Sequence, residues 1–289
     1  MVAVSLKKKK KNTRKKERRE DKENISRKEK NDKKCIKGKD LADFIKARKA
    51  SQVRSLKKKK KIIPKLTIFI NNNDPVIDTY VRLKQVYGAD IGVEVEIKRC
   101  LSSTEDLIKE IKNSNLDPNT HGIIVQLPVR GIASTDEVLL AVAPKKDVDG
   151  LSGKSSFDSA TATAINWLLT GYNIDLKNKK IAIVGAGRLV GAPLYKMWSN
   201  SNLNVFQYTK ATTNLGDELK DKDLIVSGVG VPGLIKEDMV KNGAVIVDAG
   251  SASEKGVIVG DVAQNVRERE DIIITPVKGG VGPLTIASL

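Results

Sequence analysis

The feature that most constrains the fold is a glycine-rich turn between an apolar segment and a helical pattern. Residues 180–184 predict a strand, the turn runs from Gly185 through Gly187 to Gly191, and a helix is expected to about residue 198. Such a turn lets backbone N–H groups and the helix N-terminus approach a pyrophosphate. The glycine spacing alone is a weak signal. In this context it favours a Rossmann-like dinucleotide-binding unit over a tight turn without a ligand.

The rest of the chain repeats this alternation of strands and helices. Apolar runs at 66–70, 92–97 and 122–127 predict strands in the first half, and those at 204–208, 223–226, 244–247 and 272–274 predict strands in the second. Strands that alternate with helices form parallel α/β layers. We therefore expect an α/β protein with two domains and a cleft between them. The expected parts are a tail (1–34), a catalytic α/β domain (35–158), a Rossmann-like domain (159–274) and a C-terminal segment (275–289) that returns to the first domain.

The net charge of +17 over 289 residues is concentrated at the N-terminus. Residues 1–34 hold sixteen Lys and Arg against six Asp and Glu, with few apolar residues, so we expect this tail to be disordered. Nucleic-acid binding by the tail is the less favoured alternative, because no aromatic residue is available there to stack on bases. The tail's acidic residues argue against a transit peptide, and no apolar run predicts a signal peptide or membrane span. Cytoplasm is the expected compartment.

The chain offers few metal-ligating side chains. Cys35 and Cys100 lie far apart and His121 is the single histidine, so we expect no zinc site and no other metal. His121 begins an apolar strand, where a structural role is favoured. The chemistry is therefore expected from Lys, Asp, Tyr, Gln or a bound cofactor.

Local patterns give further structural expectations. Residues 36–56 predict a helix with Leu41, Phe44 and Ile45 on one face, and the lysine run 57–61 is read as its solvated end. A second helix is expected from Pro75 to about residue 87. Ser102 with Glu105 predicts a capping box for a helix that continues through residue 111.

Four polar residues of the first half are candidates for catalysis and substrate binding. Tyr80 and Lys84 are four residues apart on one predicted helix, so they share a face. A lysine in a partly buried cleft can have a lowered pKa and act as an acid or base. Gln126 ends a predicted strand, where ligands of α/β sheets bind, although it could equally satisfy nearby backbone. Asp149, in Asp147-Val148-Asp149-Gly150, could bind an amino-pyrimidine edge or cap a turn.

The choice of dinucleotide depends on the end of the second Rossmann strand. NAD-binding proteins usually carry an Asp or Glu there for the ribose 2′-hydroxyl. This strand ends in Gln207-Tyr208-Thr209-Lys210. Without a carboxylate, and with Lys210 and Arg188 positive, the residues lean toward NADP. NAD stays possible, because both cations could simply be solvated.

The segment 275–285 has three glycines and two prolines and follows the last predicted strand. Such a segment suits a cofactor or substrate wall better than a core. Within it, Gly280 and Pro283 are candidates for substrate binding.

Several motifs resemble, in order, those of the bifunctional methylenetetrahydrofolate dehydrogenase/cyclohydrolase family. They are Asp74-Pro75 with Tyr80-Val81-Arg82-Leu83-Lys84, residues 121–128 and 144–150, Val190-Gly191-Ala192-Pro193, Gly260-Asp261-Val262 and residues 275–285, and together they cover roughly residues 35–289. A short-chain dehydrogenase also uses Tyr-x-x-x-Lys, but places it after the glycine-rich turn. Here the pair precedes the turn.

The resemblance implies an enzyme of one-carbon metabolism and purine biosynthesis. Such enzymes oxidise methylenetetrahydrofolate with NADP and hydrolyse the methenyl product to formyltetrahydrofolate. By carry-over, Lys84 would handle proton transfer in hydrolysis, Tyr80 would orient the folate, Gln126 would position Lys84 and the substrate, and Asp149 would hold the pterin-like ring. The resemblance also implies cofactor contacts at the positions Gly185, Gly187, Arg188, Gly191, Thr209, Lys210 and Gly230. It further implies a homodimer that pairs through the dinucleotide-binding domain, and it requires no metal.

The chain also departs from the family pattern. Gly185-Ala186-Gly187 replaces Gly-Arg-Ser, so the residues that commonly serve the 2′-phosphate are missing and Arg188 is the nearby substitute. Lys278 stands where relatives usually have Pro, and Leu289 is the last residue where relatives continue as a helix that packs on the first domain. We expect the missing contacts to affect stability more than chemistry. The altered turn leaves a single-activity or non-catalytic folate-binding relative as an alternative.

Overall fold

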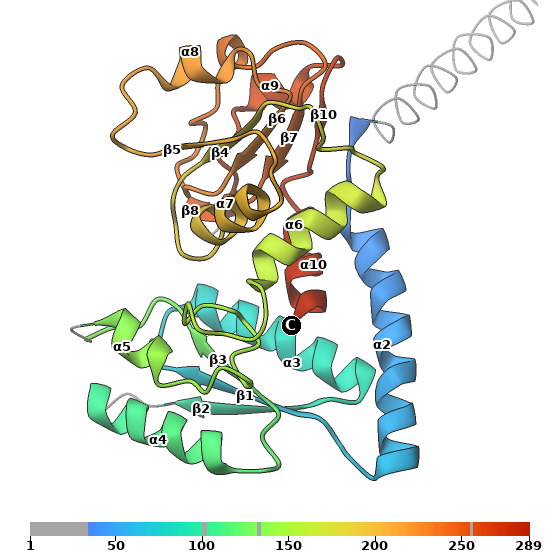
Figure 1. Ribbon diagram of the computed structural model, residues 1–289, viewed down its shortest axis with the longest axis vertical. Helices are drawn as coiled ribbons and strands as arrows, with labels where there is room; N and C mark the ends of the chain where they lie inside the picture. Colours follow the sequence, from blue (N-terminus) through green and yellow to red (C-terminus); the bar gives the residue numbers. More distant parts are fainter. Residues whose placement is uncertain (1–33, 100–102, 132–133, 255–256) are drawn as a thin grey trace, which may run out of the picture.

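The computed structural model describes residues 34–99, 103–131, 134–254 and 257–289. Residues 1–33 of the predicted basic tail and Cys100 therefore lie outside the described residues, and Lys34 is the one described residue of that tail. Figure 1 shows two lobes, each built on its own sheet, that are joined by helices crossing between them. Within the described ranges, the two larger sheets are parallel throughout, which confirms the expected α/β fold with two domains.

The first lobe is a three-stranded sheet in the order β2-β1-β3. Phe69 and Ile68 of the central strand point to opposite faces, because side chains alternate along a strand. Phe69 packs with α4 and α5, and Ile68 packs with α3. The elements are β1 (Lys65–Ile70), α3 (Pro75–Ile91), β2 (Glu94–Arg99), α4 (Thr104–Leu116), β3 (Gly122–Gln126) and α5 (Thr135–Leu140).

The second lobe holds five parallel strands in the order β10-β7-β6-β4-β5. The strands β4, β6 and β7 are fully buried, as expected for a sheet covered on both faces, whereas the edge strand β5 is only partly buried. The strands are β4 (Ile181–Val184), β5 (Val205–Tyr208), β6 (Leu224–Ser227), β7 (Val245–Asp248) and β10 (Ile273–Ile274). The helices are α6 (Ala160–Gly171), α7 (Gly191–Asn200), α8 (Leu215–Leu219), η1 (Glu237–Met239) and α9 (Gln264–Glu268). A separate antiparallel hairpin pairs β8 (Ala252–Glu254) with β9 (Val257–Val259).

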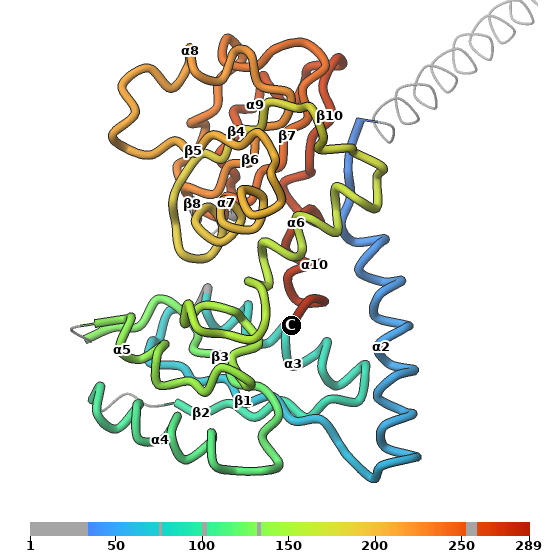
Figure 2. The backbone as a smooth tube through the Cα atoms, viewed as in Figure 1, coloured from blue at the N-terminus to red at the C-terminus, as the bar shows by residue number. Residues whose placement is uncertain are grey.

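Three helices connect the lobes, namely α2 (Gly38–Lys60), α6 and α10 (Val281–Ser288). The tube in Figure 2 shows the start of α2 beside the red C-terminal segment at the second lobe, and its end beside the first. The N–H of Ile36 donates to the carbonyl of Ile274 at 3.1 Å, and Gly38 and Lys39 donate to the carbonyl of Gly279. A Cβ on Gly38 would lie 2.0 Å from the carbonyl oxygen of Gly280, so only glycine allows this approach. The helix α10 then packs on α6, α2 and α3.

Several local expectations were wrong in detail. Phe44 is 67% exposed and does not share the buried side of α2, because Ala42 and the partly buried Ile45 face the neighbouring helices instead. The cap of α4 is Ser103, whose hydroxyl accepts from the N–H of Asp106 at 3.0 Å. Ser102 lies outside the described residues. The helix α3 extends to Ile91, β2 begins at Glu94, and residues 281–288 are already helical.

Candidate active site

The edge where β1 and β3 end brings the first candidate residues together. Ile70 is paired with Gln126 in the parallel register, so both strands finish at the same level. From α3, the Lys84 ammonium donates to Oε1 of Gln126 at 2.7 Å. The Gln126 amide donates to the carbonyl of Leu127 at 3.2 Å, so its orientation is fixed at both ends. Tyr80 lies one helical turn before Lys84 and is partly exposed.

Burial sets the protonation behaviour of this lysine. Removal from water disfavours the ammonium form and lowers the pKa of Lys84, while the negative charge of Asp149 opposes this shift. Burial likewise raises the pKa of Asp149, against the effect of Lys84. The two groups influence each other, so the structure brings Lys84, Gln126 and Asp149 into one site. Opposed shifts of this kind are typical of acid–base pairs in enzymes.

The two aspartates of the 147–150 motif have different surroundings. Asp147 is buried, and its carboxylate accepts from the N–H groups of Gly150 and Ser152 at 3.1 and 2.9 Å. It is therefore the turn cap. Among the described residues, no group donates a hydrogen bond to the carboxylate of Asp149, so its oxygens are available to a ligand.

Two buried amides next to this site were missed from the sequence. Asn72 donates to the carbonyl of Pro128 at 3.1 Å, and Oδ1 of Asn71 accepts from the N–H of Arg130 at 2.8 Å. They hold the loop after β3 against the loop after β1. The polar run directly after a buried strand was the signal that could have identified them.

The glycine-rich turn has the shape that a pyrophosphate needs. Gly185 has a φ of +105°, which favours glycine, and a Cβ on Gly191 would lie 2.0 Å from the carbonyl oxygen of Gly185. A Cβ on Gly187 would meet nothing closer than the carbonyl oxygen of Gly228 at 3.8 Å. The turn is thus tightly packed at Gly191, whereas at Gly187, near the N-terminus of α7, there is open space beside the backbone. These residues fit a bound dinucleotide.

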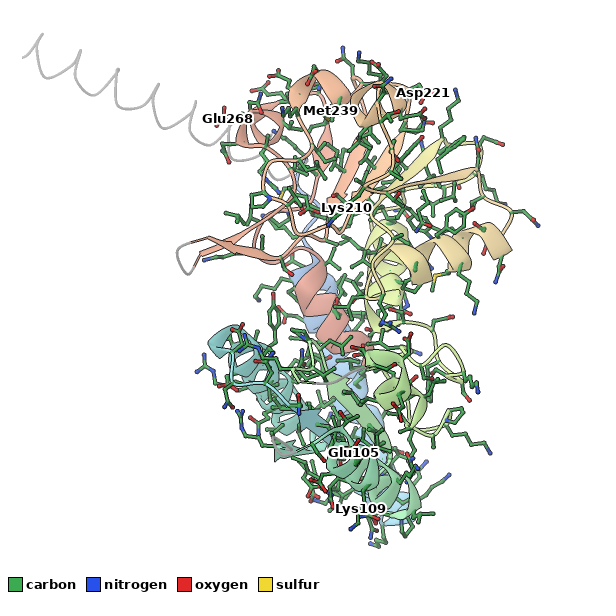
Figure 3. The ribbon with its side chains drawn as sticks, turned by 90° about the vertical axis from the view of Figure 1, so that its left-hand side faces the viewer. Glu105, Lys109, Lys210, Asp221, Met239 and Glu268 are labelled. Atoms are coloured by element: carbon green, nitrogen blue, oxygen red, sulfur yellow. The ribbon has the colours of Figure 1, made fainter. Side chains whose placement is uncertain are left out.

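The predicted cationic residues do not converge. Arg188 reaches the other lobe, where its Nη1 lies 2.5 Å from Oδ1 of Asp136. Thr209 is part of a local turn, in which its hydroxyl accepts from the N–H of Ala211 at 3.2 Å. Lys210 is exposed, and Figure 3 shows it on the side of the second lobe nearer the first, whereas Asp221 and Glu268 lie at the far end.

A buried carboxylate behind Gly230 was also missed as a functional candidate. Asp261 accepts from the Ser227 hydroxyl and from the N–H groups of Val229 and Val231, at 2.7, 2.8 and 2.9 Å. These bonds fix the loop that contains Gly230, whose φ is +77°. Gly260-Asp261-Val262 matches a family motif, but only the tertiary structure shows which loop the aspartate holds.

The segment 275–285 starts within the same network. The Thr275 hydroxyl accepts from the N–H of Asp248 at 2.8 Å, and the Arg267 guanidinium donates to the carbonyl of Thr275 at 3.0 Å and pairs with the Asp248 carboxylate. Gly280 is buried at the N-terminus of α10, and Pro283 is in its first turn. Since α10 contacts α3, the segment runs from the end of β10 in the second lobe toward the helix that carries Lys84. Lys278 is exposed, and no interaction of its side chain is recorded within the described ranges.

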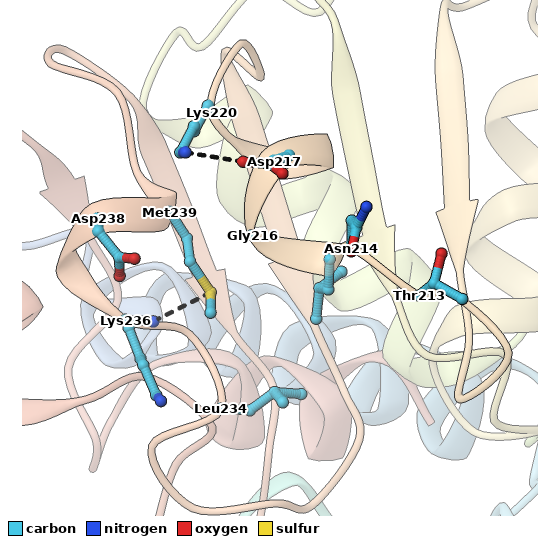
Figure 4. Close-up of a pocket in the computed structure, with 10 residues that line it drawn as sticks. Thr213, Asn214, Gly216, Asp217, Lys220, Leu234, Lys236, Asp238 and Met239 are labelled. Atoms are coloured by element: carbon cyan, nitrogen blue, oxygen red, sulfur yellow. Dashed lines mark hydrogen bonds and ion pairs between the residues drawn. The ribbon is translucent and has the colours of Figure 1, made fainter.

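Figure 4 shows a hollow between α8 and η1. Leu215, Leu234 and Met239 supply apolar surface, and Lys220 pairs with Asp217 at 2.7 Å on its rim. It contains none of the predicted cofactor residues. Figure 3 places Met239 at the end of the second lobe away from the first, so this hollow is separate from the Lys84 site.

Within the described part of the chain, no group of three or more His, Cys, Asp and Glu is placed to hold a metal ion, and no helix is long and apolar enough to cross a membrane. His121 accepts the N–H of Lys65 at 3.2 Å through Nδ1, which is a structural contact between β3 and β1.

Comparison with known proteins gives the same two parts. Residues 36–149 match the catalytic domain of tetrahydrofolate dehydrogenase/cyclohydrolase, and residues 159–289 match its NAD(P)-binding domain. The bifunctional protein FolD of Sulfurovum sp. is 37% identical over 267 residues, which are 88% of this chain and 95% of that protein.

Two solved structures agree. The FolD crystal structure from Campylobacter jejuni is 33% identical, with a TM-score of 0.82, and covers 88% of this chain and 94% of that one. The Trypanosoma brucei FolD, solved with NADP cofactor and inhibitor, is 28% identical, with a TM-score of 0.81, and covers 88% and 93%. The family expected from the motifs is confirmed, and the chain belongs to the tetrahydrofolate dehydrogenase/cyclohydrolase family.

Proposed function

We propose that this chain oxidises methylenetetrahydrofolate to methenyltetrahydrofolate with NADP and hydrolyses that product to formyltetrahydrofolate. The observation that carries the proposal is the partly buried Lys84 ammonium, bonded to Gln126 and influenced by Asp149, at the carboxyl end of β3. The family, its NAD(P)-binding domain and the shape of the glycine turn support the same function.

Bound NADP would accept the hydride that leaves the methylene carbon. The protein's part in that step is to hold the folate against the nicotinamide, which makes the transfer effectively unimolecular. In our proposal Asp149 binds the amino-pyrimidine edge of the folate, Tyr80 orients its ring, and Gly280 and Pro283 line the same space.

Lys84 acts in the hydrolytic step. Water adds to the methenyl carbon, a proton leaves that water, and the C–N bond of the five-membered ring breaks with protonation of the released nitrogen. A lysine with a lowered pKa can accept the first proton and supply the second. Gln126 keeps the Lys84 nitrogen at a fixed position through the 2.7 Å hydrogen bond.

The cofactor preference is part of the proposal. No carboxylate follows β5, where Thr209 and Lys210 lie, so the acidic residue that usually binds the free ribose 2′-hydroxyl of NAD is missing there. Lys210 and Arg188 are the cations available to a 2′-phosphate. We propose contacts of the dinucleotide with the glycines 185, 187, 191 and 230 as well.

We also propose the division of the chain into residues 35–158 and 159–274, with 275–289 returning to the first lobe.

The proposed assembly is a cytoplasmic homodimer. Among the described residues, β5 pairs with β4 alone, and Phe206 on β5 and Tyr195 on α7 are 39% and 38% exposed. Phe206→Glu would place a charge in this proposed interface, so the molar mass from light scattering should be that of a monomer. An unchanged dimer would place the interface elsewhere.

The test of the function is a pair of assays on wild type and Lys84→Met. Wild type should reduce NADP in the presence of methylenetetrahydrofolate, and it should hydrolyse methenyltetrahydrofolate. The variant should lose at least the hydrolytic activity. No turnover with NADP or NAD would refute the function, and hydrolysis without oxidation would favour the single-activity alternative raised by Gly185-Ala186-Gly187.

A further inference from the structure

The two lobes are connected by an ion pair at the edge of the dinucleotide turn. Arg188 belongs to this turn, and Asp136 lies in the first turn of α5 in the other lobe. Their side chains are 41% and 66% exposed and 2.5 Å apart. The pair is therefore accessible to solvent and to a competing anion.

Arg188 belongs to a turn that is bonded to the end of β5, the strand end at which Rossmann folds bind the ribose. The N–H of Gly185 donates to the carbonyl of Tyr208 at 2.8 Å, and the Gln207 amide donates to the carbonyl of Gly185 at 3.4 Å. The glycine turn is thus held against the end of β5 at Tyr208, two residues before Lys210. A guanidinium binds carboxylate and phosphate with the same planar array of donors, so it cannot serve both fully at once.

We propose that Asp136 and the 2′-phosphate of NADP compete for Arg188, which makes Asp136 a residue that sets the preference between NADP and NAD. The proposal rests on the function proposed above. Binding of NADP releases Asp136 and with it the direct ion pair between the lobes. Binding of NAD, which has no 2′-phosphate, leaves the pair intact.

The test measures binding to the apoprotein by calorimetry, with NADP, NAD, 2′,5′-ADP and 5′-AMP. An exposed ion pair contributes about 0.2–1 kcal/mol, so Asp136→Asn should tighten NADP and 2′,5′-ADP binding by roughly 1.4- to 5-fold. NAD and 5′-AMP binding should not change. In an Arg188→Gln background, the same Asp136 substitution should have no effect, because the shared partner is gone.

Glu137→Gln is the matched control, because Glu137 is the next acidic residue in the first turn of α5 and is exposed. It removes the same charge from the same helix end and should leave the NADP preference unchanged. Equal gains in NADP affinity in Asp136→Asn and Glu137→Gln would show that the effect comes from the general charge of the helix end, and they would overturn the proposal. A gain from Asp136→Asn that persists in the Arg188→Gln background would also overturn it. If wild type binds neither NADP nor NAD, the proposed function fails, which is a distinguishable result.

Discussion

The substitution Gly191→Ala tests the packing of the dinucleotide turn. The added Cβ would lie 2.0 Å from the carbonyl oxygen of Gly185 and 2.7 Å from its carbonyl carbon, and both atoms belong to backbone that cannot rotate away. The turn would have to open by about 1 Å before normal contact is restored. Forced overpacking of this kind costs about 1–3 kcal/mol. For a protein of this size the melting temperature should then fall by about 2–12 °C.

Binding should fall as well, because the turn presents the N–H groups at the start of α7. The loss of one hydrogen bond to a charged phosphate, about 1.5–3 kcal/mol, weakens NADP binding by roughly 10- to 150-fold. Calorimetric melting gives the first quantity, and titration of the apoprotein with NADP gives the second.

Gly187→Ala is the matched control for stability. Its Cβ would meet no atom nearer than 3.8 Å, so the melting temperature should not change. The methyl group would nevertheless project into the open space beside the Gly187 backbone and should weaken NADP binding. The reasoning is refuted if Gly191→Ala melts at the wild-type temperature, or if both variants lose the same stability.

The remaining predictions concern charged groups. Lys84→Met should raise the melting temperature, because the lowered pKa of Lys84 means that its ammonium destabilises the native state. This cost is complete below the lowered pKa and disappears as the pH rises toward the ordinary lysine pKa, so the gain should be largest at low pH, and a gain independent of pH would contradict the reasoning. Asp149→Asn should move the acidic limb of the hydrolytic rate to lower pH, since the carboxylate raises the pKa of Lys84, which must be unprotonated to accept a proton from water; an unmoved limb in a pH–rate profile would separate the two groups. Asp261→Ala should cost about 3 kcal/mol in urea unfolding, because the buried Ser227 hydroxyl and two partly buried N–H groups lose their acceptor; a change within 0.5 kcal/mol, roughly that of a surface substitution, would exclude this role.

Much of the fold follows from local sequence patterns. The apolar run of β1 and the glycine turn before α7 were predicted within one or two residues, because each depends on neighbours along the chain. The shared face of Tyr80 and Lys84 follows from helix geometry alone. The predicted burial of Phe44 was wrong, because helix geometry gives the face on which a residue lies but not the neighbouring segments that cover that face.

What the sequence by itself determined is therefore the alternation of strands and helices, the dinucleotide turn and the residue types of the candidate site. The tertiary structure alone decided that Lys84 meets Gln126, 42 residues away, that Asp147 caps a turn while Asp149 remains available, and that Arg188 reaches Asp136 in the other lobe. Hydrogen-bond partners and burial depend on which segments pack together. That packing is a property of the whole chain, which spacing within one segment does not encode.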